Sequence, residues 1–214
     1  MIVAFAYADM KNKLAPIYRA CADGLVENIR VVMPGIRILH IADDTTVPIK
    51  GCDVLRVKRK VGLMSWRLLA QCMAHGGADE ILFTEPDVRF NEDVHKVFDS
   101  PFDVTMTGRE FATSLKGEPI AGKYTLGANF SRSGDFWKDV TKYCLTLDAE
   151  KQTWGGDMMA VEHIADSGKY GIKHLDPAVY NHVPNQQDDL SQAKIVHYKG
   201  TRKTWLFPLV AEAA

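Results

Sequence analysis

Two carboxylates flank a proline in the segment "ILFTEPDVRFN" (Ile81–Asn91), directly after an apolar run. Carboxylates are costly to bury unless they pair with a cation or bind a metal. Pro86 fixes one backbone angle, so Glu85 and Asp87 could converge on one ion if the chain bends around it. Carboxylate oxygens suit Mg²⁺ and Mn²⁺, which commonly bridge substrate phosphates. The structural alternative is that one acid pairs with Arg89 and the other caps the next helix.

A second group of polar residues follows the predicted strand Ile195–Tyr198, in the segment "HYKGTRKTW". His197 could supply a further metal ligand through its neutral imidazole. Gly200 lets a ligand approach the backbone closely. Lys203 offers a point charge to a phosphate, and Arg202 could bind one with two parallel hydrogen bonds. A single histidine at a strand end is often structural, but these residue types in this order form a more specific pattern.

Alternating strands and helices must position these residues. Apolar runs predict strands at Ile2–Ala8, Ile36–Asp43, Cys52–Arg59, Glu80–Phe90, Phe102–Gly108, Tyr124–Ser133, Ile172–Leu175 and Ile195–Tyr198. Helical spacing predicts helices at Lys11–Arg30, Leu63–His75, Glu92–Phe98 (capped by Asn91), Ser133–Leu147 and Asp157–Gly168. This alternation predicts an α/β fold with a mostly parallel central sheet flanked by helices. Ligands bind such sheets at the carboxyl ends of the strands, where Glu85 and Asp87 lie.

The composition is that of an ordinary globular domain, with 214 residues of which 46% are hydrophobic and 25% charged. A net charge of −1 gives no overall attraction to nucleic acid or a membrane, although the basic segments Arg56–Lys60 and Lys194–Lys203 could contact an anion. No apolar run approaches the roughly 20 residues that span a bilayer. The four scattered cysteines suggest a reducing compartment. We therefore expect a single cytoplasmic domain.

The two polar segments together resemble the signature of a known enzyme family. The chain is similar to the nucleotide-sugar glycosyltransferases of the GT-A fold, in particular the glycogenin- and lipopolysaccharide-galactosyltransferase-like family (glycosyltransferase family 8). That family has an apolar strand ending in D-x-D, matched here by Glu85–Asp87, and a later H-x-x-G-x-x-K-P-W motif. The later motif is matched, with Thr204 in place of proline, by His197, Gly200, Lys203 and Trp205. The resemblance covers nearly the whole chain.

The resemblance implies a GT-A-type single domain over residues 1–214. Residues 1–110 would form the nucleotide-binding half, and residues 111–214 the acceptor side with the C-terminal His/Lys loop. It also implies a divalent cation, Mn²⁺ or Mg²⁺, and a nucleotide diphosphate sugar as donor. Asp87 and His197 would ligate the metal, and Glu85 would bind the metal or the donor ribose. Lys203 would contact the diphosphate, beside Gly200 in the same loop.

Further donor-binding residues follow from the same resemblance. Arg67, in the helix before the acid-ended strand, would steady the acids and the phosphates. Gly127 would lie near the donor sugar. Residues at the ends of the first two strands would lie against the nucleotide base, namely Tyr7, Ala8, Asp9 and Asp43.

The chain departs from the family pattern in three places. Glu85 replaces an aspartate, which lengthens one ligand arm by a methylene, and Thr125 stands where the family usually has Asn. Asp157 and Met158 stand where Asp-Gln is usual. The segment "WGGD" (Trp154–Asp157) also resembles other GT-A transferases, in which the acid contacts the acceptor or acts as a base. Asp157 is therefore the candidate catalytic residue, although an acid at a helix start is equally explained by the helix dipole.

The implied reaction is metal-dependent transfer of a hexosyl or pentosyl group from a nucleotide diphosphate sugar, with UDP-sugars favoured. Family likeness favours retention of the anomeric configuration. The acceptor could be a glycan, a lipid-linked group, a protein or, given the basic segments, a nucleic acid. Two loops could cover the site and exclude water, Leu115–Lys123 and Lys199–Leu206.

Three alternative functions can be weighed on the residues. A sugar-phosphate nucleotidylyltransferase needs a Gly-rich loop after its first strand, and "FAYADMKNK" contains no glycine. A catalytically inactive relative that binds a nucleotide or a glycan stays open because of Asp157–Met158. A scaffold protein, in which the acids and His197 are structural, would bind neither metal nor nucleotide. The expected oligomeric state is left open.

Overall fold

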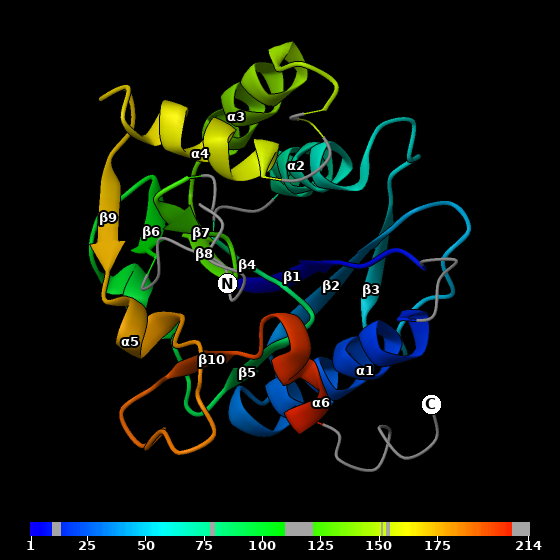
Figure 1. The fold of residues 1–214 in the computed structure, drawn as a ribbon, viewed down its shortest axis with the longest axis vertical. Coiled ribbons are helices and arrows are strands. Elements are labelled where there is room, and N and C mark those ends of the chain that lie inside the picture. Colours follow the sequence, from blue (N-terminus) through cyan, green and yellow to red (C-terminus); the bar gives the residue numbers. More distant parts are fainter. Residues whose placement is uncertain (10–13, 78–79, 110–121, 151, 153–154, 207–214) are drawn as a thin grey trace.

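A central sheet of eight strands organises the protein (Figure 1). The computed structural model describes residues 1–9, 14–77, 80–109, 122–150, 152 and 155–206. The strands of this sheet are β1 (Ile2–Ala6), β2 (Arg37–Ala42), β3 (Asp53–Arg56), β4 (Ile81–Thr84), β6 (Val104–Gly108), β7 (Tyr124–Thr125), β8 (Ala128–Ser131) and β9 (Ile172–Leu175). Their order is β3-β2-β1-β4-β8-β6-β7, with β9 paired to β6.

The sheet is parallel in its first half and mixed in its second. β1 pairs in parallel with β2 and β4, and β2 pairs in parallel with β3. β8 runs antiparallel to β4 and to β6, whereas β9 is parallel to β6. The predicted α/β fold with a mostly parallel sheet is therefore confirmed. It brings the carboxyl ends of β1 and β4 side by side.

Helices cover both faces of the sheet, and a separate core lies on each face. α1 (Ala15–Val32) packs on one side, and α2 (Leu63–Ala74), α3 (Gly134–Thr146) and α4 (Gly156–Ala165) gather on the other (Figure 1). Successive residues of a strand point to opposite faces. Phe5 accordingly contributes to the core beneath α1, and its neighbour Ala4 to the core beneath α2, α3 and α4.

Local sequence signals account for where these helices lie. In α1 the residues Cys21, Leu25 and Ile29 recur every fourth position and are fully buried. At the start of α3, the Ser133 hydroxyl accepts a hydrogen bond from the Phe136 backbone N–H, which satisfies a donor that the helix itself leaves unpaired. α4 begins after Gly155, whose φ of 85° lies in the left-handed region that glycine adopts without strain.

The predicted strand Glu80–Phe90 is wrong, because the chain forms two strands in two different sheets. β4 ends at Thr84, a turn follows, and β5 (Val88–Phe90) pairs antiparallel with β10 (Ile195–His197) in a separate two-stranded sheet. Pro86 lies in this turn and has no N–H with which to continue the ladder. The register places His197 opposite Val88, one residue beyond the second acid.

Other boundaries also differ from the prediction. The predicted strand Tyr124–Ser133 is split into β7 and β8. The predicted helix after Asn91 is one 3-10 turn, η2 (His95–Asp99), and the Asn91 side chain donates to the carbonyls of Leu190 and Ala193 instead of capping it. Short helical turns that the sequence did not predict are η1 (His75–Gly77), α5 (Pro177–Tyr180), η3 (Gly200–Arg202) and α6 (Lys203–Leu206).

Three predicted features fall wholly or partly outside the described residues. The boundary between the two halves at 110/111 lies there, as do Trp154 and most of the proposed loop Leu115–Lys123. Among the residues that the structure describes, no helix is long and apolar enough to cross a membrane.

Candidate functional site

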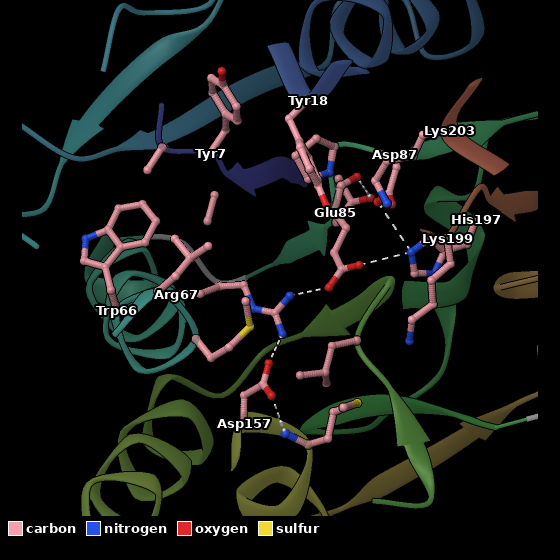
Figure 2. A pocket seen from close by; sticks show the side chains of 18 of the residues that line it. Tyr7, Tyr18, Trp66, Arg67, Glu85, Asp87, Asp157, His197, Lys199 and Lys203 are labelled. Atoms are coloured by element: carbon pink, nitrogen blue, oxygen red, sulfur yellow. Dashed lines mark hydrogen bonds and ion pairs between the residues drawn. The ribbon is translucent and has the colours of Figure 1, made fainter. Parts of the chain in front are cut away.

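A cleft of about 330 Å³ opens at the carboxyl ends of β1 and β4. Residues just after β1 form one wall, the turn after β4 forms the floor, and the start of α4 and the segment after β10 close it (Figure 2). Its polar lining comes mainly from Tyr7, Tyr18, Arg67, Glu85, Asp87, Asp157, His197, Lys199 and Lys203. Helix α2, the turn after β4, the start of α4 and the segment around β10 thus bring charges from four distant parts of the chain into one cleft.

Three side chains in this cleft converge as metal ligands would. One atom each from Glu85, Asp87 and His197 can be chosen so that all three lie within 4.8 Å of one another. His197 Nε2 lies 3.0 Å from Glu85 Oε2 and 3.4 Å from Asp87 Oδ1. His197 and Asp87 are almost fully buried, at 1% and 4% exposure. Two carboxylates and an imidazole form a donor set that suits Mn²⁺ or Mg²⁺.

The hydrogen bonding of His197 supports this fit. Its Nδ1 lies 3.1 Å from the side-chain oxygen of Asn181. Its buried Nε2 is close to Glu85 but is not aligned for a hydrogen bond, and has no such partner among the described residues. This nitrogen faces both carboxylates, so either a proton that forms the ion pairs or a cation held between the carboxylates would account for its position.

Positive groups balance the carboxylates. Arg67 forms ion pairs with both Glu85 and Asp157, and Lys203 Nζ lies 2.5 Å from Asp87 Oδ2. Burial by itself would raise the pKa of Glu85, but Arg67 and His197 outweigh it and hold that pKa well below its usual range. Burial likewise opposes ionisation of Asp87, yet His197 and Lys203 lower its pKa. Both acids are therefore ionised and offer oxygens to a cation.

The same interactions that lower the pKa values of Glu85 and Asp87 raise the pKa of His197. Burial disfavours its charged form, but Asp87 and Glu85 outweigh burial and raise its pKa to about 9. Without a cation, the charged imidazolium thus compensates the carboxylates. The carboxylates of the cleft thus share their cationic partners in one network.

Comparison with known proteins identifies the architecture around this cleft. No protein-family model matches the sequence, and none of the curated proteins compared with it does. Among solved structures, the crystal structure of the galactosyltransferase LgtC with donor and acceptor sugar analogs is similar, with a TM-score of 0.62 at 12% identity. That match covers 96% of this chain and 89% of LgtC. An active-site mutant of LgtC matches with a TM-score of 0.58 at 13% identity, covering 94% and 88%. The chain has the GT-A fold.

In this GT-A fold, most of the predicted site residues line the one cleft. They are Tyr7, Ala8, Arg67, Glu85, Asp87, Asp157, His197, Gly200 and Lys203. Three other predicted residues, Asp9, Asp43 and Gly127, are not among those that line it. For all of these residues, the roles in binding and catalysis stay predictions.

Asp43 and Asp9 have structural partners of their own. Asp43 Oδ1 accepts hydrogen bonds from the backbone N–H and the hydroxyl of both Thr45 and Thr46. Asp9 accepts from the Tyr7 hydroxyl at 2.7 Å and from the Val47 backbone N–H. These carboxylates hold the loops after β1 and β2, which accounts for both residues without a nucleotide.

Asp157 and Met158 lie in the first turn of α4. Asp157 is buried and bound to Arg67, and its other oxygen accepts from the Met158 backbone N–H. The Met158 thioether receives a hydrogen bond from Arg109 at 2.9 Å. The acid is thus part of the charge network, and an apolar side chain lines the wall beside it.

Sequence reasoning missed Lys199 and Asn181. Lys199 lines the cleft, and burial lowers the pKa of its ammonium group. The sequence placed it in a basic segment and at the start of the proposed covering loop Lys199–Leu206, but spacing does not separate a site lysine from a surface one. Asn181 follows the four-residue helix α5, which has no periodic signal of its own. Only the tertiary structure places these two side chains beside His197.

Proposed function

We propose that this protein is a metal-dependent glycosyltransferase that moves a sugar from a nucleotide diphosphate sugar to a hydroxyl acceptor. The observation that carries the proposal is the convergence of Glu85, Asp87 and His197 in a cleft that also contains Arg67 and Lys203. The GT-A fold and the likeness to a galactosyltransferase solved with donor and acceptor sugar analogs support it. A UDP-sugar as donor and Mn²⁺ as cation are the specific forms that we propose.

The donor would lie along the carboxyl edge of the parallel strands. The base would rest against Tyr7 and Ala8 at the end of β1, where open α/β sheets bind ligands. The diphosphate would lie between the metal ligands and the segment that carries Gly200 and Lys203. Gly200 has a φ of 69°, so this turn favours a residue without a side chain and leaves its backbone open to a phosphate.

The chemistry requires stabilisation of the leaving group. Breaking the bond between sugar and phosphate develops negative charge on the departing diphosphate, and a bound divalent cation would neutralise part of that charge. Lys203 would move from Asp87 to the phosphate, and Lys199 would add a second positive charge on the same side. Apolar wall residues such as Leu126 and Met158 would keep water from competing with the acceptor hydroxyl.

Asp157 is the proposed contact for the acceptor or the base that accepts its proton. Its ion pair with Arg67 would have to loosen for it to take a proton, because a carboxylate held by a guanidinium is a weak base. This observation also favours a second candidate function, namely a GT-A-fold protein that binds a nucleotide or glycan without turnover. The acceptor class (glycan, lipid-linked group, protein or nucleic acid) and the cytoplasmic location stay predictions.

Calorimetric titration with UDP and GDP, each with and without Mn²⁺, tests the proposal. We expect Mn²⁺-dependent binding of one nucleotide, lost in Asp87→Ala and retained in the control Asp99→Ala, which removes an exposed carboxylate away from the cleft. Hydrolysis or transfer assays with the corresponding nucleotide sugars then separate the two candidates. Binding without any turnover would favour the inactive relative. Absence of nucleotide binding under every metal condition would leave only a scaffold role.

A further inference from the structure

A buried amide contacts the ring of His197 at the nitrogen opposite the proposed metal-binding atom. Asn181 Oδ1 lies 3.1 Å from His197 Nδ1, and the two residues are each only 1% exposed. A side-chain carbonyl oxygen can only accept, so Nδ1 is the donor. In a neutral imidazole with its proton on Nδ1, the lone pair is on Nε2, the atom that faces Glu85 and Asp87.

The amide has a second hydrogen-bond partner in a neighbouring hydroxyl. Asn181 Nδ2 donates to Thr125 Oγ1, which lies 3.0 Å from the hydroxyl of Thr107. All of these groups are buried. The opposite orientation of the amide would present an N–H to His197 Nδ1 and would require the ring proton on Nε2, where it would point at the carboxylates. In the structure, Nδ2 faces Thr125 and Oδ1 faces the ring, and this is the orientation that leaves Nε2 free for a cation.

The backbone fixes the distance between the amide and the ring. The His182 N–H donates to the Ile195 carbonyl at 3.0 Å, and the His197 N–H donates to the His182 carbonyl at 2.7 Å. The residue after Asn181 is thus paired with the strand β10 that carries His197. Both side chains are held by one short ladder.

Gly127 provides the space in which the two side chains meet. A Cβ atom at this position would lie 2.8 Å from His197 Cε1 and closer still to His197 Nδ1 and Asn181 Oδ1. Real Cβ atoms do not approach other atoms so closely, and these neighbours are buried and cannot move aside. A glycine is therefore required beneath the hydrogen bond between Asn181 and His197.

We infer that Asn181 is a positioning residue for the proposed metal site. It holds His197 in the tautomer and ring orientation that present Nε2 to the cation. Gly127 leaves the space in which the two side chains make contact. Histidines that ligate metals generally donate their second ring N–H to such a partner, and loss of the partner typically weakens metal affinity about 10- to 100-fold. The inference rests on the proposed function, because it assumes that Glu85, Asp87 and His197 bind a divalent cation.

The test is Mn²⁺ affinity of the full chain, read from the electron paramagnetic resonance signal of free Mn²⁺ without nucleotide. We expect Asn181→Ala to bind about 10- to 100-fold more weakly. Asn181→Asp keeps an acceptor for Nδ1–H and should bind close to the unaltered protein. Asn28→Ala is the matched control, because it removes an amide with two hydrogen bonds to the Phe90 backbone and lines no part of the cleft. It should leave Mn²⁺ affinity unchanged.

A second measurement reports the tautomer directly. With Mg²⁺ bound, the ¹⁵N shifts of His197 should show the proton on Nδ1 in the unaltered protein and in Asn181→Asp, and a mixture of tautomers in Asn181→Ala. If Asn181→Ala does not fold, Thr125→Val replaces it, since this variant keeps the amide but removes its second hydrogen-bond partner and so loosens its hold on the ring. Circular dichroism checks that each variant is folded.

The outcomes separate the inference from the proposed function. If the unaltered protein binds no Mn²⁺, the proposed metal site is wrong, and the inference falls with it. If the unaltered protein binds Mn²⁺ and the Asn181 and Thr125 variants bind equally well with the same tautomer, only the inference is overturned. Weakened binding in Asn181→Ala, rescue in Asn181→Asp and no effect in Asn28→Ala would support it.

Discussion

Lys199 is the residue whose role can be separated most cleanly from the stability of the fold. Its ammonium group lines the cleft, where burial lowers its pKa. The nearby charges that act on it are mixed, with Glu85 and Asp87 favouring its charged form and Arg67 and Arg109 opposing it. A half-buried lysine in such surroundings contributes little to stability and is more useful to an anionic ligand.

We expect Lys199→Met to raise or preserve the free energy of unfolding while weakening UDP binding about tenfold, which corresponds to about 1.4 kcal/mol. Methionine keeps much of the side-chain volume without the cost of burying a charge. Urea unfolding and calorimetry on the same preparation give the two quantities. A variant that is clearly less stable and binds UDP normally would make Lys199 a structural residue.

His40 supplies a prediction about acid sensitivity. The ring is buried; its Nδ1 accepts from the Ile49 N–H, and its Nε2 lies 3.2 Å from the Tyr7 carbonyl oxygen. Burial lowers its pKa from 6.5 to about 4. Between these values the unfolded chain binds the proton and the folded chain does not, so stability is full above pH 6.5 and falls as the pH drops towards 4. The loss from this residue reaches about 3 kcal/mol.

The comparison with His40→Gln isolates this contribution. Glutamine can donate and accept but does not titrate, so we expect the variant to lose less stability than the unaltered protein between pH 7.5 and pH 4.5. Urea unfolding at the two pH values measures the difference. Equal losses in the two proteins would show that His40 is not the acid-sensitive group.

Among the secondary-structure elements, helix α3 combines an N-terminal cap with buried aromatic residues in its first turn. Ser133 caps the helix, and the next turn places Phe136 and Trp137 in fully buried positions. We expect Ser133→Ala to lower the free energy of unfolding by about 1 kcal/mol, because an N–H of the first turn loses its acceptor. Ser133→Asp should restore most of the loss. Urea unfolding checks both variants, and an unchanged midpoint in Ser133→Ala would contradict the prediction.

The helices and strands also show how much of the structure could be predicted from the sequence. Most strands and helices were predictable from apolar runs and helical spacing, and β9 has the predicted bounds. The split between β4 and β5 was missed because Val88 and Phe90 continue the apolar pattern beyond Pro86. Glu85, Asp87 and His197 could be proposed as metal ligands because their residue types are specific. Asn181 could not, because its contact with His197 depends on the pairing between the residue after it and β10.

At the scale of the whole molecule, the cation and the nucleotide should bind cooperatively. Lys203 is paired with Asp87, so a metal that takes over Asp87 would release the lysine for a phosphate. Such coupling is reciprocal, and each ligand should tighten the binding of the other. We expect Mn²⁺ and UDP together to raise the melting temperature by more than the sum of their separate effects. A single ligand present at a hundred times its dissociation constant stabilises the folded protein by about 2.7 kcal/mol.

Differential scanning fluorimetry with each ligand alone and with both measures this coupling. Asp87→Ala should abolish the extra stabilisation, and Asp99→Ala should retain it. Strictly additive shifts in the unaltered protein would mean that the two ligands bind independently.

The two-stranded sheet of β5 and β10 has a consequence for how the protein is made. β5 directly follows the two acids, whereas its partner β10 carries the histidine and is encoded near the opposite end of the chain (Figure 1). A ribosome synthesises the acids early and the histidine late. During translation the emerging chain therefore already holds Arg67 for Glu85, but it holds Asp87 without the imidazole and lysine that pair with it. A chain released before residue 195 would lack His197 and Lys203, and so one of the three proposed metal ligands and the lysine paired with Asp87.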